Sequence, residues 1–336
     1  MFIKKNADKW KEYQQTTTDN PDEMAERFVT LIDDVSYAKT FYPKSKVTRW
    51  VNGIAAGIYQ GIYKNRKEKY SRIFTFWKYE LPLLFGKYHR IFLFTTIVFL
   101  LIVAIGVFSS VYNPEFVKGI LGEGYVKETE DNIANGDPLG IYKNENTFAV
   151  FVNIAFNNIR VAFYAFIGGF TFGLFTLYLM WQNGLMLGVF QHMFFAHDVG
   201  WKSVLVIWIH GTLEISAIII SCTAGFILFS GILFPGTFSR LYAFRQTAKD
   251  AAKIMIVLIP IFIVAAFFES YVTHLMSQTV DKQDNGGMPV WVSILILAAS
   301  LSFIIWYFVI WPIILRKRGW QMKPDGAINR IKEENA

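Results

Sequence analysis

Long apolar runs constrain the fold of this chain more than any other feature. The clearest run, IFLFTTIVFLLIVAIGVFSS at residues 91–110, contains no charged side chain. About 20 consecutive apolar residues suffice for a helix to cross the hydrocarbon core of a bilayer. Hydrophobic residues make up 53% of the 336, and 32 residues are Phe. The sequence therefore predicts a multi-span membrane protein and excludes a soluble protein with a basic surface.

The distribution of Lys and Arg predicts how the chain is oriented in the membrane. Residues 44–90 contain 11 Lys and Arg, whereas residues 112–147 contain 3. Because basic residues collect in cytoplasmic loops, we expect the N-terminus inside and residues 112–147 outside. The basic residues of 235–253 and the RKR sequence at 316–318 place both segments inside. This bias accounts for the net charge of +7 without a nucleic-acid partner.

The alternation of sides requires six crossings. A long apolar segment ends just before Arg240, on the inside, so it must begin outside. The short stretch before it must then cross too, either completely or as a broken helix. The expected fold class is all-α: a polytopic transmembrane helix bundle of about six spans, N-in/C-in. The expected spans are residues 91–110, 161–181, 183–199, 203–234, 254–274 and 290–315, with 112–147 as an external loop.

Three regions follow from these spans. Residues 1–90 form a cytoplasmic and interfacial helical region, residues 91–315 form the transmembrane domain, and residues 316–336 form a basic cytoplasmic tail. Within the first region, Asn20 and Pro21 precede acidic residues and an apolar stripe. Asn at an N-cap and Pro at the first helical position are typical helix starts, so we expect a helix there.

Four ionisable side chains fall at membrane depth: Arg160, His210, Glu214 and Glu269. Such residues are rare within spans and indicate functional sites. The expected topology places all four in the outer half of the bilayer. His210 and Glu214 are four residues apart, and therefore share one face of a helix.

Polar neighbours extend this group into two stripes. Ser221 continues the stripe of His210 and Glu214, while Asn153 and Asn157 share a helix face with Arg160. We expect both stripes to line one outward-facing polar pocket, in which Arg160 pairs with a buried carboxylate. The residues expected in this ligand or transport pocket are His210, Glu214, Arg160, Glu269, Asn153, Asn157 and Ser221.

Three interpretations of the pocket stay open. In the first, the pocket is a buried ion network that sets helix register. In the second, it is a ligand or transport site whose carboxylate takes up a proton or a cation. In the third, it is a catalytic or metal site. His210 and Glu214 could bind one metal ion, but zinc needs at least three protein ligands. The sequence shows no nucleophile beside a base and no phosphate-binding glycine loop. We therefore predict no catalytic residue, no metal and no cofactor, and an enzyme is not favoured.

Residues 157–188 and 210–229 together resemble the stage II sporulation protein M family. The shared pattern is an N-x-x-V-A stretch, a glycine-rich span, an N-G-x-x-L-G turn, and H-G-x-x-E followed by small residues and A-G. Ser216 departs from it, since many members have proline there. Close helix packing is expected at Gly169, Gly173, Gly184, Gly188, Gly211 and Gly225. The other matching residues are Asn158, Val161, Ala162, Asn183, Leu187, His210, Glu214, Ala217 and Ala224.

The resemblance implies a multi-pass protein of the bacterial inner, or cytoplasmic, membrane. The founding member acts with other membrane and wall-remodelling proteins during engulfment of the forespore, and wider members have been compared with transporter permeases. We therefore expect a permease-like or scaffolding subunit of a membrane complex. Its partners would be the lipid bilayer and either another membrane protein or a second copy, with no nucleic acid. The alternative is a proton- or ion-coupled transporter, and an intramembrane enzyme is the least favoured.

Overall fold

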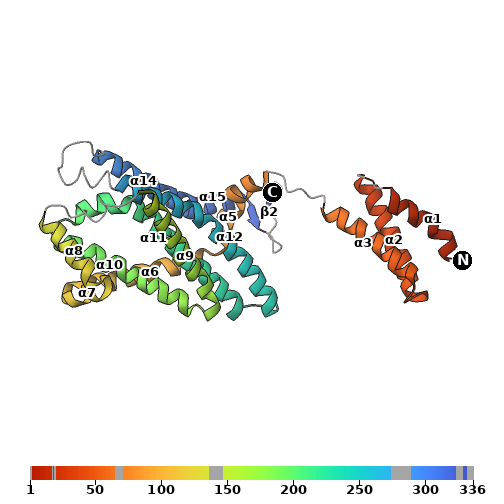
Figure 1. The fold of residues 1–336 in the computed structure, drawn as a ribbon, viewed down its shortest axis with the longest axis horizontal. Helices are drawn as coiled ribbons and strands as arrows, with labels where there is room; N and C mark the ends of the chain where they lie inside the picture. The colour runs from red at the N-terminus through yellow and green to blue at the C-terminus, as the bar shows by residue number, and fades with distance from the viewer. Residues whose placement is uncertain are drawn as a thin grey trace, which may run out of the picture. The chain divides into compact units, whose positions relative to one another are not determined.

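The computed structural model describes residues 2–16, 18, 20–64, 71–135, 147–273, 289–322 and 328–330. It is an all-α polytopic helix bundle with one small antiparallel sheet, β1 (Trp320–Met322) paired with β2 (Ile328–Arg330) (Figure 1). The chain divides into two units, Met1–Phe74 and Thr75–Ala336. The expected region 1–90 therefore contains the first unit together with residues 75–90 of the second, which precede the first span.

The described residues up to 64 of the first unit form three helices: α1 (Phe2–Gln15), α2 (Pro21–Phe41) and α3 (Lys46–Lys64). Helix α2 begins as expected, since the Asn20 side chain accepts a hydrogen bond from the Asp22 backbone amide at 3.1 Å. The core of the unit consists of Trp10, Leu31, Val35, Val51, Ile54 and Ala55.

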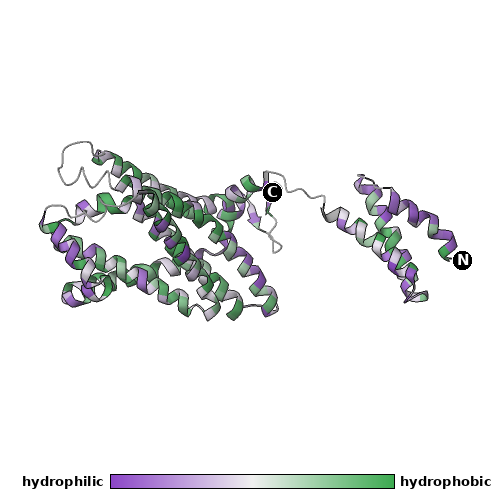
Figure 2. Cartoon of the chain, in the orientation of Figure 1, coloured by the Kyte–Doolittle hydropathy of each residue, from purple (hydrophilic) through white to green (hydrophobic). Residues whose placement is uncertain are grey.

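Among the residues that the structure describes, five helical segments are long and apolar enough to cross a membrane, and Figure 2 shows their hydrophobic colouring. Helix α10 (Leu174–Ala196) is a further long helix of 23 residues, in which polar residues such as Gln182, Asn183 and Gln191 lower the hydropathy; it takes the place of the sixth expected span. The other five are α6 (His89–Tyr112), α9 (Thr147–Ile167) with the 3-10 turn η3 (Gly168–Thr171), α11 (Gly200–Leu233), α12 (Arg240–Phe267) with the π-helix η4 (Phe268–Thr273), and α14 (Val290–Ile305) with η5 (Trp306–Ile310) and α15 (Trp311–Lys317).

The second and third spans differ from the expected ones. The stretch 161–181 is not one helix, because η3 and two residues with positive φ, Phe172 (53°) and Gly173 (77°), turn the chain between α9 and α10. Helix α10 therefore spans about 34 Å at 1.5 Å per residue, and 183–199 is not a separate short span. The turn sequence GGFTFG is itself apolar, so hydropathy did not reveal it. The two helices still run in opposite directions, so six crossings remain the expectation.

The segment 112–147 contains two helices where we expected a loop, α7 (Pro114–Leu121) and α8 (Glu123–Ala134); residues 136–146 lie outside the described part. Both helices pack on the bundle. Val126 of α8 is buried in a cluster with Met193 and Phe194 of α10 and with Val206 of α11. These helices therefore cover one end of the bundle.

The segment before the first span consists of α4 (Ser71–Thr75), the π-helix η1 (Phe76–Glu80) and α5 (Leu81–Lys87). Instead of lying freely at the headgroups, it packs on the last span: the Tyr307 hydroxyl donates to the Trp77 carbonyl at 2.6 Å. Lys87 pairs with the buried Asp250 at 2.6 Å, and Lys253 pairs with Glu80. Burial, and then the neighbouring Asp250 carboxylate, raise the pKa of the Tyr88 phenol.

Helix α11 is the centre of the bundle. It packs against α6, α9, α10, α12 and α14, and it contributes the longest series of buried residues, from Gly200 to Gly231. Because the middle of α11 is surrounded by other helices, a polar side chain there faces mainly protein. This position places His210 and Glu214 inside the bundle.

Candidate functional site

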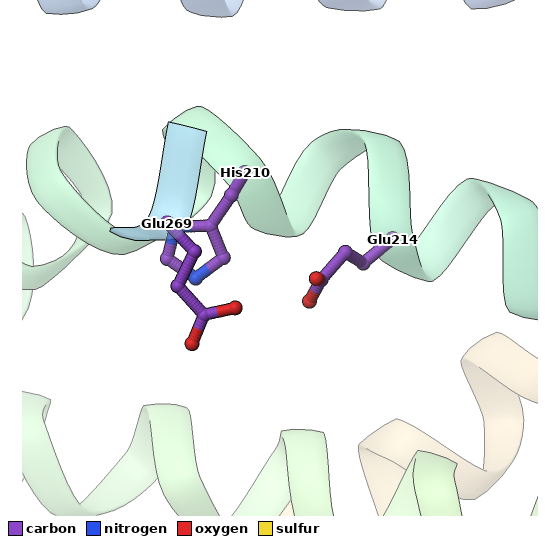
Figure 3. Close-up of side chains that lie close together, drawn as sticks. All are labelled: His210, Glu214 and Glu269. Atoms are coloured by element: carbon purple, nitrogen blue, oxygen red, sulfur yellow. The ribbon is translucent and has the colours of Figure 1, made fainter. Parts of the chain in front are cut away.

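Three ionisable side chains converge inside the bundle (Figure 3). His210 and Glu214 come from successive turns of α11, and Glu269 comes from η4. One potential ligand atom from each residue lies within 4.8 Å of the others. Glu269 lies in a π-helical turn, an irregularity that is frequent at functional sites. The structure thus brings together three of the four ionisable residues that the sequence singled out; we call them the His–Glu–Glu cluster.

The histidine ring of the cluster is held by a specific hydrogen bond. His210 is 4% exposed, and its Nδ1 lies 2.9 Å from Thr273 Oγ1. The Thr273 hydroxyl donates its proton to the Phe268 carbonyl at 3.1 Å, so it accepts from Nδ1–H. A neutral His210 ring then carries its lone pair on Nε2. Figure 3 shows this edge of the ring directed toward the two carboxylates.

One carboxylate of the cluster is held from α9. The Asn158 side-chain amide donates to Glu214 Oε1 at 2.6 Å. From the sequence, we identified Asn158 only as a residue of the family pattern and assigned the neighbouring Asn157 to the pocket. A signal was available, because Asn158 lies on the same helix face as the small residues Ala155, Ala162 and Ala165, which are buried against the bundle.

The structure does not place the polar stripe of α9 in the pocket, where we expected Asn153, Asn157 and Arg160. All three are exposed on the face of α9 that points away from the bundle. Arg160 donates to Asn157 Oδ1 at 2.9 Å, and in the described chain it forms no ion pair with either carboxylate. Adjacent residues of a helix are about 100° apart, so Asn157 must face outward when Asn158 faces inward.

Ser221 and the glycines serve packing rather than the cluster. Ser221 is buried and donates to the Ile218 carbonyl of its own helix at 2.8 Å. Gly211 has open space beside it, and Gly173 supplies the positive φ of the α9–α10 turn. A Cβ would meet a neighbouring helix or turn at close range at Gly169, Gly184, Gly188 and Gly225.

A cavity of about 330 Å³ adjoins the cluster. His210, Gly211 and Glu214 line it on α11, and Tyr125 and Phe190 line it on α8 and α10. Burial raises the pKa of the Tyr125 phenol to about 12, so this residue presents a neutral hydroxyl group. The cavity connects the cluster with the helices of the segment that the charge bias predicts to be external.

The electrostatics of the cluster require a positive partner. Two carboxylates are close together among apolar side chains, and in the described chain no Lys or Arg pairs with either of them. Burying uncompensated charge is costly unless it is paired or neutralised. The cluster can therefore take up a proton or a cation. The described residues of the cluster include no serine, cysteine or lysine nucleophile.

Comparison with known proteins agrees with this architecture. The family model of stage II sporulation protein M matches residues 95–274, more than half of the chain, and this range contains the whole cluster. A domain of unknown function (DUF8413) matches residues 1–64. The uncharacterized protein MJ0793 of Methanocaldococcus jannaschii is 32% identical over 125 residues, which is 37% of this chain and 70% of that protein. No solved structure matches.

Proposed function

Because the chain belongs to the stage II sporulation protein M family of integral membrane proteins, we propose that it is a permease-like subunit of a complex in a prokaryotic cytoplasmic membrane. One observation carries this proposal: a span of the bundle presents a polar, positively charged face to its surroundings. This face consists of Asn153, Asn157, Arg160 and Tyr164, which are all exposed. We call it the α9 polar face.

Arg160 lies deep within its span. At 1.5 Å per residue, it is about 20 Å from Thr147 and about 10 Å from Ile167 along α9. A charged side chain near the middle of a span costs about 2.5–3.5 kcal/mol on insertion scales. A compensating partner is therefore expected.

The side chain of Arg160 points away from the nearer membrane surface. Side chains in an α-helix tilt toward its N-terminus, and the hydrogen bond to Asn157 draws the guanidinium in the same direction. Arg160 therefore does not snorkel toward the inner headgroups from this rotamer. Its partner has to lie within the membrane, and the chemistry that suits a guanidinium best is a carboxylate.

The occupant that we propose for the α9 polar face is a transmembrane helix of a different protein, carrying an acidic residue at the depth of Arg160. A two-fold dimer would place the same face against itself. That face contains one cation and two amides but no carboxylate, so a second copy would leave Arg160 without a counter-charge. Charge complementarity favours the heterologous partner.

Site-specific crosslinking in the native membrane tests this assignment. We expect a photo-crosslinking residue at Phe156, beside the α9 polar face, to form one adduct with a second membrane protein. The same residue at Leu100, which is exposed on α6, serves as the control and should give no such adduct. Arg160→Gln should reduce the Phe156 adduct about tenfold, because it removes the charge.

A charge exchange identifies the contact. The Arg160→Glu variant should lose the partner, and replacing the partner's acidic residue with arginine should restore it. Among the described residues, the Arg160 side chain forms a hydrogen bond only with Asn157. Arg160→Gln and Arg160→Glu should therefore leave the thermal stability of the purified chain unchanged. An adduct with the mass of two copies of this chain would show that a second copy, and not a different protein, covers the face. An adduct whose yield does not change in the Arg160 variants would refute the proposed role of this face.

The cavity favours a second function, proton- or ion-coupled transport. It reaches Glu214 from the side of α7 and α8, so a solute or ion could enter there without crossing the whole bundle. Proton uptake into liposomes containing the purified chain, driven by a membrane potential, is the test. Glu214→Gln should slow uptake at least tenfold. Rates equal to those of protein-free liposomes would exclude transport by the chain alone.

A further inference from the structure

We propose that His210, Glu214 and Glu269 bind one divalent transition-metal cation, with zinc as the best-fitting member of this class. The proposal goes beyond the subunit role, since it concerns a site within the chain and requires no partner. The pair on α11 supplies only two ligands, and the fold provides a third from η4. Three protein ligands and an open fourth position are typical of zinc sites that remain accessible to a small molecule.

The donor set selects the class of cation. One imidazole nitrogen and two carboxylate oxygens suit zinc, manganese and iron, whereas magnesium and calcium prefer oxygen ligands throughout. Two ionised carboxylates carry a charge of about −2, which a divalent cation neutralises without further side chains. Neutralisation matters here because α11 is enclosed by other helices.

The geometry needs only a small adjustment to hold the ion. Ligand atoms bound to one zinc ion at about 2.0–2.2 Å lie roughly 3.4 Å apart in a tetrahedron. The corresponding atoms of the cluster lie within 4.8 Å of one another. Rotation of the two flexible glutamate side chains closes this difference without moving the helices. The cavity beside Glu214 leaves the fourth position accessible to water.

Two neighbouring residues already hold the ligands in the form that a metal ion requires. Thr273 accepts a hydrogen bond from His210 Nδ1–H, and Nε2 forms no hydrogen bond with a described residue. Asn158 holds Oε1 of Glu214, and the carboxyl groups of Glu214 and Glu269 lie within hydrogen-bonding reach of each other. Partners of this kind orient metal ligands, and losing one lowers affinity about 10- to 100-fold. A pair of carboxylates that only shared a proton would not require this histidine tautomer.

Metal binding by the purified full-length chain tests the proposal. After chelator treatment, titration with zinc followed by elemental analysis should give one ion per chain. Cobalt substitution should produce the visible absorption of a low-symmetry site with one nitrogen ligand. Glu269→Gln should weaken zinc binding at least 100-fold. The control His197→Gln alters the histidine that follows the last residue of α10, outside the cluster, and should leave affinity unchanged.

A conservative pair at Thr273 separates metal binding from folding. Thr273→Ser keeps the hydroxyl and should bind zinc like the native chain, whereas Thr273→Val should bind it about 10- to 100-fold more weakly. Thr273→Val that binds as tightly as Thr273→Ser would remove the assigned role of the hydroxyl and overturn the ligand geometry. Zinc that stays bound in Glu269→Gln, or a native chain without stoichiometric zinc, would overturn the site.

The outcomes of this experiment and of the crosslinking are independent. Zinc binding without an adduct at Phe156 would support the metal site and refute the subunit role. A chain that forms an Arg160-dependent adduct but binds no zinc keeps the subunit role, and its two carboxylates are then balanced by a proton.

Discussion

The Gly225→Leu variant is expected not to assemble a stable bundle. A Cβ at Gly225 would overlap the Ala165 carbonyl and lie 2.6 Å from Thr176 Oγ1. These two atoms are joined to each other, because the Thr176 hydroxyl donates to the Ala165 carbonyl at 2.7 Å. Neither atom can yield without breaking this bond between α9 and α10.

Gly169 lies on the other side of the same contact. A Cβ at Gly169 would overlap the Gly225 carbonyl, so α11 touches the α9–α10 turn backbone to backbone. Overpacking by single methylenes costs about 1–3 kcal/mol, and leucine adds four heavy atoms where even one does not fit. We expect a loss above about 3 kcal/mol, which is a large part of the roughly 5–15 kcal/mol that stabilises a typical folded domain.

Thermal aggregation of detergent-purified protein measures this loss. Gly225→Leu should be recovered poorly and lose its monodisperse peak at a temperature well below that of the native chain. Gly211→Leu is the matched control, since Gly211 is on the same helix and has no atom within 4 Å of its Cβ position. Leucine also has a higher helix propensity than glycine, so this control should be at least as stable as the native chain. Equal losses in both variants would contradict the packing argument.

Trp10→Ala is expected to unfold the first unit while the bundle stays folded. Trp10 is 0% exposed, and its Nε1 donates to Asp34 Oδ2 at 2.8 Å. Replacing a buried Trp with Ala costs about 3–5 kcal/mol. A unit of this size has little stability to spare, since small domains bury a smaller fraction of their surface.

Limited proteolysis of the full-length protein in membranes measures the effect. Trp10→Ala should be cleaved within residues 1–74 at protease concentrations that leave the native chain intact, while the transmembrane fragment persists. Phe41→Ala is the control, because this aromatic side chain is 61% exposed and loses little packing. Protection of Trp10→Ala equal to that of the control would show that Trp10 does not stabilise the unit.

The error in the second and third spans has a definite physical origin. Hydropathy reports how apolar a segment is, and the turn between α9 and α10 is as apolar as the helices that it joins. The positive φ at Phe172 and Gly173 depends on contacts of the turn with α11, which a local pattern does not contain. The expected break near Asn183 therefore falls inside α10, where that residue donates to the Leu179 carbonyl of its own helix at 2.8 Å.

The placement of Arg160 followed from the same error. With a span starting at residue 161, Arg160 lies at the outer end of the second span, in the same half of the bilayer as the two glutamates, and pairing with one of them is expected. With α9 starting at Thr147, Arg160 lies deep in the span and on the outer face of the helix. Packing decides which side of a helix faces the bundle. Because adjacent residues point in different directions, the packing of α9 turns Asn158 toward the cluster and Asn157 away from it.

The sequence by itself determined the membrane location, the all-α class, the expected sidedness and the choice of His210, Glu214 and Glu269 as unusual residues. These conclusions follow from composition and local spacing, because the free energy of placing a segment in lipid depends on the charge and the apolar length of that segment alone. Only the tertiary structure decided that Glu269 meets the pair on α11, that Asn158 and Thr273 orient the cluster, and that Arg160 faces outward. Those facts depend on contacts between segments up to 63 residues apart, and packing of whole helices, rather than any local pattern, selects such contacts.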